Sequence, residues 1–270
     1  MCGRYGLGNP EFSETRFQAA RLPEFDVPEL YQPRFNITPS EEVLTVAFSR
    51  HIGKRVLKPM VWSLTAQWAL HDASKRRPTN IKTETIIDRP AYRRLLTGKR
   101  CVIPAQHFYE WQRVNTRKKQ PWAIALKGDE PFGFAGIWEA CKVADGWLTT
   151  CAILTTHPNG MVGALHDRMP VILRPADEAT WLDPDVTNPT ALMPLFEPLP
   201  DDAIEMYPVG MSVNDGRNEG PGLLQRAELA PIPDNRAARP VSDPTQEAAN
   251  GWQVSGVHRK LPKRQTLPLI

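Results

Sequence analysis

Residues 132–155 read FGFAGIWEACKVADGWLTTCAILT, and they carry the strongest architectural signal in the chain. Two strand-like runs, 137–143 and 147–154, lie on either side of the dipeptide Asp145-Gly146. Asp-Gly between two such runs is typical of a tight antiparallel hairpin. The middle of the sequence therefore predicts two paired strands.

Outward from this hairpin, short strand-like runs recur and outnumber the helical patterns. The expected strands are 43–48, 56–63, 101–112, 122–126, 132–138, 147–155 and 170–173. The expected short helices are 10–21, 91–96, 177–182 and 190–196, and 23–39 is expected to be a proline-punctuated loop. The elements do not alternate in β-α-β order, and no repeat of fixed period is visible. We therefore expect an α+β, β-rich single domain with a central antiparallel sheet or open barrel and short peripheral helices.

The composition sets the limits of this domain. Of 270 residues, 41% are hydrophobic and 23% charged, which is typical of a folded globular protein. The 27 prolines argue against a long helical bundle, because proline breaks helix interiors. From Pro231 onward there are six prolines and a single aromatic residue, Trp252. We therefore expect a domain over 1–228 and a Pro-rich, weakly basic, disordered tail over 229–270.

Charge and cysteine usage exclude several classes of protein. The net charge of +3 permits nucleic-acid binding but does not require it. No apolar run reaches the roughly 18 residues that span a bilayer, and the N-terminus lacks the layout of a signal peptide. We therefore expect a cytoplasmic monomer without a membrane partner. Cys101, Cys141 and Cys151 lie in apolar surroundings and are expected to be free and buried. The cysteines and histidines lack metal-ligand spacing, so no metal or other cofactor is expected.

Cys2 directly follows the initiator methionine. Removal of Met1 would give an N-terminal cysteine, with a thiol of pKa about 8.5 beside an α-amine of pKa about 8. With an aldehyde, the amine can form a Schiff base, and the thiol can then close onto the imine carbon as a thiazolidine. The alternative is that Cys2 is an early residue without a chemical role.

Three polar sites in strand-like or apolar settings add candidates. Asn80 and Lys82 lie in NIKTET, Glu110 lies among aromatic residues in FYEW, and His166 begins HDRMP. A buried Glu110 would suit general acid–base work, and a histidine can transfer protons near neutral pH. Each also has a structural explanation: a solvent-facing strand residue for Glu110, a turn former for Asn80, and a charged cluster with Asp167 and Arg168 for His166.

The order of the motifs favours the functional explanation of these residues over the structural one. MCGR at the N-terminus, RFNITP, WSLTAQWA, NIKTET, RCVIPAQHFYEW and HDRMPVIL occur in one chain. Together they resemble the SOS-response-associated peptidase (SRAP) family, also described as abasic-site processing proteins, from Met1 to about Leu224. This resemblance implies a β-rich fold with a groove for single-stranded or forked DNA. It also implies covalent capture of abasic sites as a thiazolidine crosslink, with an associated AP-lyase activity and self-reversal, at the nucleoid.

The resemblance also implies roles for individual residues. Cys2 would be the nucleophile, Asn80 would hold its α-amine, Glu110 would help open the sugar ring, and His166 would assist proton transfer. The residues expected to bind DNA are Arg4, Lys82 and Arg168, which would neutralise phosphates, and Trp68, which could stack on a base. Core packing is the alternative for Trp62 and Trp68, and it is favoured for Trp62.

Three positions depart from the family pattern. Lys82 stands where arginine is usual, which keeps the charge but loses the bidentate fork. His107 stands where glycine usually precedes FYEW, and residues 63–66 lack the usual glycine and proline.

Two other functions remain open. Cys2, Glu110 and His166 could form a thiol hydrolase that cuts peptide bonds, acting on peptides without DNA. A noncatalytic DNA-binding module would instead bind intact and abasic DNA equally and would tolerate Cys2→Ala.

Overall fold

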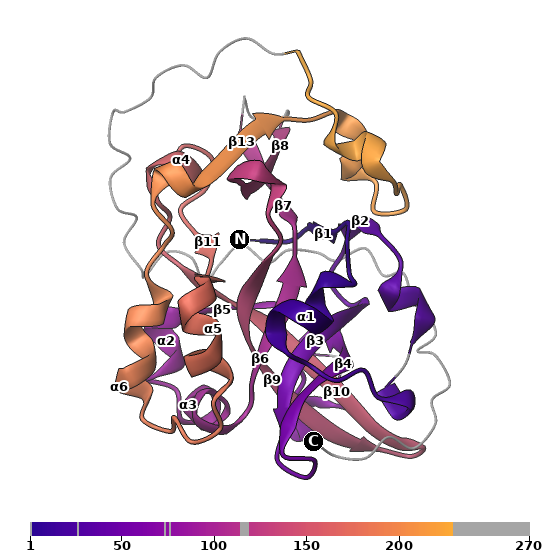
Figure 1. Cartoon of the computed structure of the whole chain (residues 1–270), viewed down its shortest axis with the longest axis vertical. Coiled ribbons are helices and arrows are strands. Elements are labelled where there is room, and N and C mark those ends of the chain that lie inside the picture. The colour runs from indigo at the N-terminus through magenta and orange to yellow at the C-terminus, as the bar shows by residue number, and fades with distance from the viewer. Residues whose placement is uncertain (1, 26, 73, 76, 114–118, 229–270) are drawn as a thin grey trace.

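A closed barrel of five strands forms the centre of the molecule (Figure 1). The computed structural model describes residues 2–25, 27–72, 74–75, 77–113 and 119–228. Around the barrel the strand order is β10-β4-β3-β6-β9, and β9 pairs with β10 to close it. The pairs are antiparallel except β10 with β4, which is parallel. The barrel strands are β3 (Glu42–Ser49), β4 (Lys54–Trp62), β6 (Arg100–Ala105), β9 (Phe132–Val143) and β10 (Gly146–Thr156).

A second sheet packs on the barrel and contains the N-terminal strand. Its order is β13-β8-β7-β1-β2, and all its pairs are antiparallel. Tyr5 of β1 packs edge-to-face on Trp62 of β4 and Phe134 of β9, with ring centroids 5.3 and 5.7 Å apart. The sheet is therefore anchored to the barrel next to the N-terminus. Its strands are β1 (Tyr5–Leu7), β2 (Arg34–Ile37), β7 (His107–Arg113), β8 (Lys119–Leu126) and β13 (Ile204–Pro208).

Short helices and strands surround these two sheets (Figure 1). The α-helices are α1 (Phe12–Phe17), α2 (Thr83–Ile86), α3 (Pro90–Gly98), α4 (Gly160–Gly163), α5 (Pro175–Leu182) and α6 (Pro189–Leu192). The short strands are β5 (Asn80–Lys82), β11 (Met169–Pro170) and β12 (Ile172–Leu173). The 3₁₀ helices are η1 (Pro23–Phe25), η2 (Pro28–Tyr31), η3 (Gln67–Ala69), η4 (Lys127–Asp129), η5 (Met193–Phe196), η6 (Asp201–Ala203), η7 (Met211–Asn214) and η8 (Pro221–Leu224).

The structure confirms the expected β-rich fold with short peripheral helices. The Asp145-Gly146 hairpin is present as β9 and β10, Trp62 is buried in the core, and Cys101, Cys141 and Cys151 are free and buried. Within the described part of the chain, no helix is long and apolar enough to cross a membrane.

Some expected elements were wrong in their bounds. The run 101–112 is two strands in different sheets, because the chain turns from β6 to β7 at Gln106. The expected loop 23–39 contains η1, η2 and β2, and the helix expected at 10–21 covers only Phe12–Phe17. The expected tail, 229–270, lies outside the described residues, so the boundary at 228 stays a prediction.

Candidate functional site

Cys2 lies just before β1, which pairs between β7 and the edge strand β2 in the five-stranded sheet. Strand β1 pairs with β7 in a register that sets Gly6 opposite His107, and the Tyr109 amide donates to the Arg4 carbonyl at 2.9 Å. Glycine is required at position 6 because a Cβ there would overlap the His107 ring. This close packing holds the N-terminal segment, and the Cys2 side chain is fully buried.

The Cys2 thiol is held in its protonated form. Its Sγ donates to the Arg4 carbonyl at 3.9 Å. Burial, and secondly the nearby carboxylate of Glu110, raise the pKa of the thiol well above its ordinary value. The residue therefore provides a neutral S–H rather than a thiolate near pH 7.

Asn80 connects the N-terminus to the barrel. Strand β5 runs parallel to β10, with Asn80 opposite Ile153. The Asn80 Nδ2 donates to the Cys2 carbonyl at 2.8 Å and to Thr79 Oγ1 at 3.2 Å. Its Oδ1 is buried and accepts no hydrogen bond from any described residue. Because an unsatisfied buried acceptor is costly, this oxygen is a candidate for binding a donor beside Cys2.

Glu110 and His166 lie close enough to Cys2 to form one electrostatic cluster. Glu110 is on β7, in register with Trp122 of β8, and is 3% exposed. Its carboxylate raises the pKa of both the Cys2 thiol and the His166 imidazole. For His166, burial is the larger effect and lowers the pKa overall, so the ring is neutral at pH 7.

The loop after α4 fixes the His166 ring. The His166 amide donates to the Val162 carbonyl at 3.0 Å. Its Nδ1 lies 3.0 Å from the amide nitrogen of Arg168 and 2.8 Å from Asp167 Oδ1. These contacts orient the ring from one side and place the HDRMP segment against the cluster.

Both arginines that were expected to bind phosphate, Arg4 and Arg168, make hydrogen bonds within the protein. Arg4 Nη1 donates to Asn36 Oδ1 and to the Val213 carbonyl, each at 2.7 Å, and its guanidinium lies 5.8 Å from the Trp111 ring centre. Burial lowers the pKa of Arg4. The side chain therefore fastens the 211–218 segment to the sheet.

Arg168 is buried and makes a bidentate pair with Glu84, at 2.5 and 2.8 Å. It also donates to the Thr155 carbonyl of β10. Lys82, in contrast, is exposed at the end of β5, one strand position beyond the buried Ile81. Of the three basic residues expected to bind DNA, Lys82 is therefore the most exposed, and it lies two positions after Asn80.

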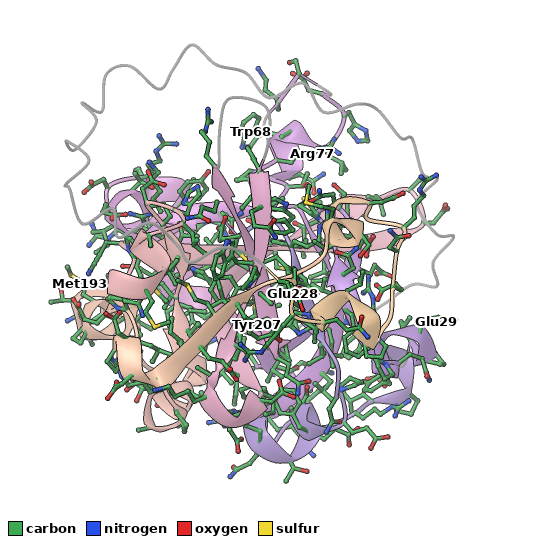
Figure 2. The ribbon with its side chains drawn as sticks, turned by 90° about the horizontal axis from the view of Figure 1, so that it is seen from above. Glu29, Trp68, Arg77, Met193, Tyr207 and Glu228 are labelled. Carbon is green, nitrogen blue, oxygen red and sulfur yellow. The ribbon has the colours of Figure 1, made fainter. Side chains whose placement is uncertain are left out.

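Trp68 is exposed at the surface (Figure 2). Its neighbour Gln67 accepts from the Lys142 amide at 2.6 Å, near the turn of the β9–β10 hairpin. Asn80 lies opposite Ile153, whose partner on β9 is Gly136. Gly136 and Lys142 are six positions apart, which is about 20 Å along a strand. The structure therefore brings Cys2, Asn80, Glu110 and His166 together and leaves Trp68 at a distance.

The sequence reasoning missed two residues that build the site. Asn36 is buried and donates to the carbonyls of Asp215 and Asn218, at 3.0 and 2.8 Å, besides accepting from Arg4. Glu84 pairs with Arg168. Both lie inside motifs already noted, RFNITP and NIKTET, but their partners are too distant in sequence to be identified from spacing. Among the described residues, no three His, Cys, Asp or Glu side chains gather as metal ligands.

Comparisons with known proteins show the family and the fold. A family model described as SOS response associated peptidase (SRAP) matches residues 1–216. Abasic site processing protein YoqW of Bacillus subtilis (strain 168) is 36% identical, covering 83% of this chain and 99% of that protein. Abasic site processing protein HMCES of Rattus norvegicus is 28% identical, covering 85% and 77%. A solved structure from Bacteroides thetaiotaomicron shares the fold, with a TM-score of 0.71 and 23% identity over 84% of this chain and 100% of that one.

Proposed function

Since this chain belongs to the SOS response associated peptidase family, we propose that it captures abasic sites in single-stranded or forked DNA as a covalent crosslink to Cys2. Its relatives are named abasic site processing proteins, which supports a role in handling abasic sites and DNA damage. The observation that carries the finer proposal is the buried Asn80 Oδ1, an acceptor beside Cys2 with no partner among the described residues. Removal of Met1 would create an α-amine at Cys2 that can donate to this oxygen.

The α-amine makes the first bond. Its nitrogen adds to the aldehyde carbon of the opened sugar, and loss of water gives the imine. The Cys2 sulfur then adds to the imine carbon, and the thiol proton goes to the imine nitrogen, which closes the thiazolidine. The raised pKa of the thiol supports this order, because a neutral S–H leaves the amine as the first nucleophile.

Glu110 and His166 act as the general acids and bases of these steps. An abasic deoxyribose is mainly a closed hemiacetal, so ring opening needs an acid and a base. The buried Glu110 carboxylate transfers the proton that opens the sugar ring. The neutral His166 accepts and returns a proton when the thiazolidine closes and when the crosslink reverses. An associated AP-lyase step would use the same imine.

Lys82 would meet a phosphate beside the captured sugar, because it is exposed next to Asn80. Arg168 would reach a second phosphate only by exchanging Glu84 for it, while Arg4 shapes the wall of the site. Trp68 would contact only a more distant part of the strand. One chain carries all four reacting groups, so a monomer acting on DNA at the nucleoid is sufficient.

The thiol hydrolase alternative is less well supported. A cysteine hydrolase needs a thiolate, whereas burial and the Glu110 carboxylate disfavour the thiolate at Cys2.

The test is incubation with a single-stranded oligonucleotide that carries one abasic site, followed by a denaturing gel and intact mass. We expect a heat-resistant crosslink to protein lacking Met1. Cys2→Ala should abolish it, and Asn80→Ala should slow it by about tenfold or more. Cys141→Ala is the matched control, because it removes another buried thiol elsewhere and should crosslink normally. No crosslink in protein confirmed to lack Met1, or equal binding of intact and abasic DNA, would overturn the proposal and favour a noncatalytic module.

A further inference from the structure

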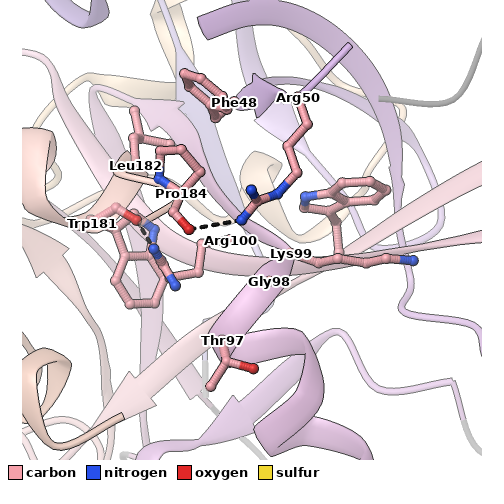
Figure 3. A pocket seen from close by; sticks show the side chains of 10 residues that line it. Phe48, Arg50, Thr97, Gly98, Lys99, Arg100, Trp181, Leu182 and Pro184 are labelled. Atoms are coloured by element: carbon pink, nitrogen blue, oxygen red, sulfur yellow. Dashed lines mark hydrogen bonds between the residues drawn. The ribbon is translucent and has the colours of Figure 1, made fainter. Parts of the chain in front are cut away.

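A cavity of about 190 Å³ lies between the end of β3, the α3–β6 connection and the end of α5 (Figure 3). None of Cys2, Asn80, Glu110 and His166 lines it. The cavity is thus separate from the cluster that would capture abasic sites, and any ligand it takes is a different one.

The wall of the cavity is positively charged. Arg50, Lys99 and Arg100 line it, and no acidic residue does. Lys99 is neutralised by Glu139, but neither Arg50 nor Arg100 makes an ion pair with any described residue. The guanidinium groups of Arg50 and Arg100 therefore make no direct ion pair at the cavity, although the Asp183 carboxylate acts on Arg100 at longer range.

Arg100 is buried and bonded only to backbone oxygens. It donates to the carbonyls of Trp181 at 2.6 Å and Leu96 at 2.7 Å, and to that of Asp183. Burial lowers its pKa to about 10, the Asp183 carboxylate opposes this shift, and the Arg50 charge adds to it. Arg50 is thus close enough to repel Arg100. An anion between them would relieve this repulsion.

Arg50 is oriented toward the cavity from its other side. Its Nη2 donates to the Pro184 carbonyl at 2.8 Å, as Figure 3 shows, and the side chain is otherwise exposed. The guanidinium keeps further N–H groups that a phosphate oxygen can accept.

The remaining lining combines a polar donor with apolar rings. Trp138 is 4% exposed, and its indole N–H donates to no described residue. Phe48, Trp181 and Leu182 complete the apolar wall. An indole N–H that donates to no described residue, beside two guanidinium groups and aromatic rings, suits an anion attached to a planar, partly apolar body.

We propose that this cavity binds the phosphate group of a nucleotide. Arg50 and the Trp138 N–H donate to the phosphate oxygens, and the buried Arg100 attracts the phosphate electrostatically. The nucleoside packs on the apolar wall. The phosphate could belong to a free mononucleotide or to the end of a DNA strand, since both present the same chemistry.

The test follows the tryptophan fluorescence of the full chain during titration with three probes. They are dAMP, inorganic phosphate, and a 5′-phosphorylated single-stranded oligonucleotide without an abasic site. We expect saturable quenching that Arg50→Gln weakens by about tenfold and that added phosphate competes away. Arg93→Gln is the matched control, because it removes the same charge from an exposed position on α3 outside the cavity. Abasic-site capture should be unchanged in Arg50→Gln.

Each outcome decides the proposal. Binding of dAMP that depends on Arg50 identifies a free nucleotide as the source, and binding of the oligonucleotide alone, with the same dependence, identifies a strand end. No saturable signal with any probe at millimolar concentration, or equal effects of Arg50→Gln and Arg93→Gln, overturns it.

Discussion

Acid should loosen the sheet that carries Cys2, through His107. The His107 ring is 2% exposed, lies against Gly6 of β1, stacks on Phe35 at 6.1 Å and places Nε2 3.3 Å from the Phe35 carbonyl. Burial lowers its pKa from 6.5 to about 4, an effect that the Phe35 carbonyl only partly offsets. The folded protein therefore holds this ring neutral where the unfolded chain would protonate it.

The size of the effect follows from this shift. Because the folded-state pKa is the lower one, the contribution of His107 is fully present above pH 6.5 and is lost as the pH falls toward 4. Each pKa unit corresponds to about 1.4 kcal/mol, so the free energy of unfolding should fall by about 3 kcal/mol between pH 7 and pH 4. Other acidic groups titrate in the same range, so the measured quantity must be a difference between variants.

The contribution of His107 can be measured by urea unfolding of the wild type and of His107→Gln at pH 7, 5.5 and 4, followed by tryptophan fluorescence. The amide can still donate to the Phe35 carbonyl but does not titrate. The difference in unfolding free energy should shift by about 3 kcal/mol in favour of the variant as the pH falls. His51→Gln, at an exposed turn, is the control and should show no such shift. A difference that stays constant between pH 7 and 4 would refute the reasoning.

Two further predictions concern the neighbours of the site. Gly6→Ala should destabilise the protein by about 1–3 kcal/mol in urea unfolding, because the new Cβ overlaps the His107 ring. Adding His107→Gly should restore most of the lost unfolding free energy, because it removes the ring that the new Cβ overlaps. A double variant as unstable as Gly6→Ala alone would contradict this explanation. Glu84→Gln should lower stability by about 1 kcal/mol while strengthening binding to intact single-stranded DNA at low salt, because Arg168 loses its carboxylate and becomes available to phosphate. Unchanged DNA affinity, measured by fluorescence anisotropy, would show that Arg168 has a structural role only.

Sequence patterns predicted the elements of the fold that are determined by residues close together in the sequence. The hairpin of β9 and β10 has long apolar runs and a turn dipeptide with a defined preference, so it was found with its partner. Strand β1 was missed because it is three residues long and includes Gly6, and it exists through pairing with β2 and β7. The split at Gln106 was also missed, since the apolar pattern runs through the change of sheet.

The candidate site was predictable as a set of residues but not as an arrangement. Cys2, Asn80 and Glu110 were identified from their motifs, yet only the fold shows that Asn80 binds the Cys2 carbonyl. The pairing of Glu84 with Arg168 joins residues 84 positions apart, so spacing could not reveal it. The expected contact of Trp68 with DNA stays a prediction; the hydrogen bond from the Lys142 amide to Gln67 places the segment of Trp68 near the turn of the β9–β10 hairpin.

The pairing of β1 with β7 limits when the N-terminal segment can be buried during synthesis. Strand β1 needs β7, whose first residue is His107, so the N-terminus cannot be enclosed until more than a hundred residues have been synthesised. At about 5–20 residues per second, this leaves an interval of roughly 5–20 s. An aminopeptidase must reach an extended terminus, so the proposed mechanism requires that Met1 be removed within that interval, before Cys2 is buried. If that mechanism holds, overexpression that outpaces this removal would give natively folded protein without the proposed reactive amine.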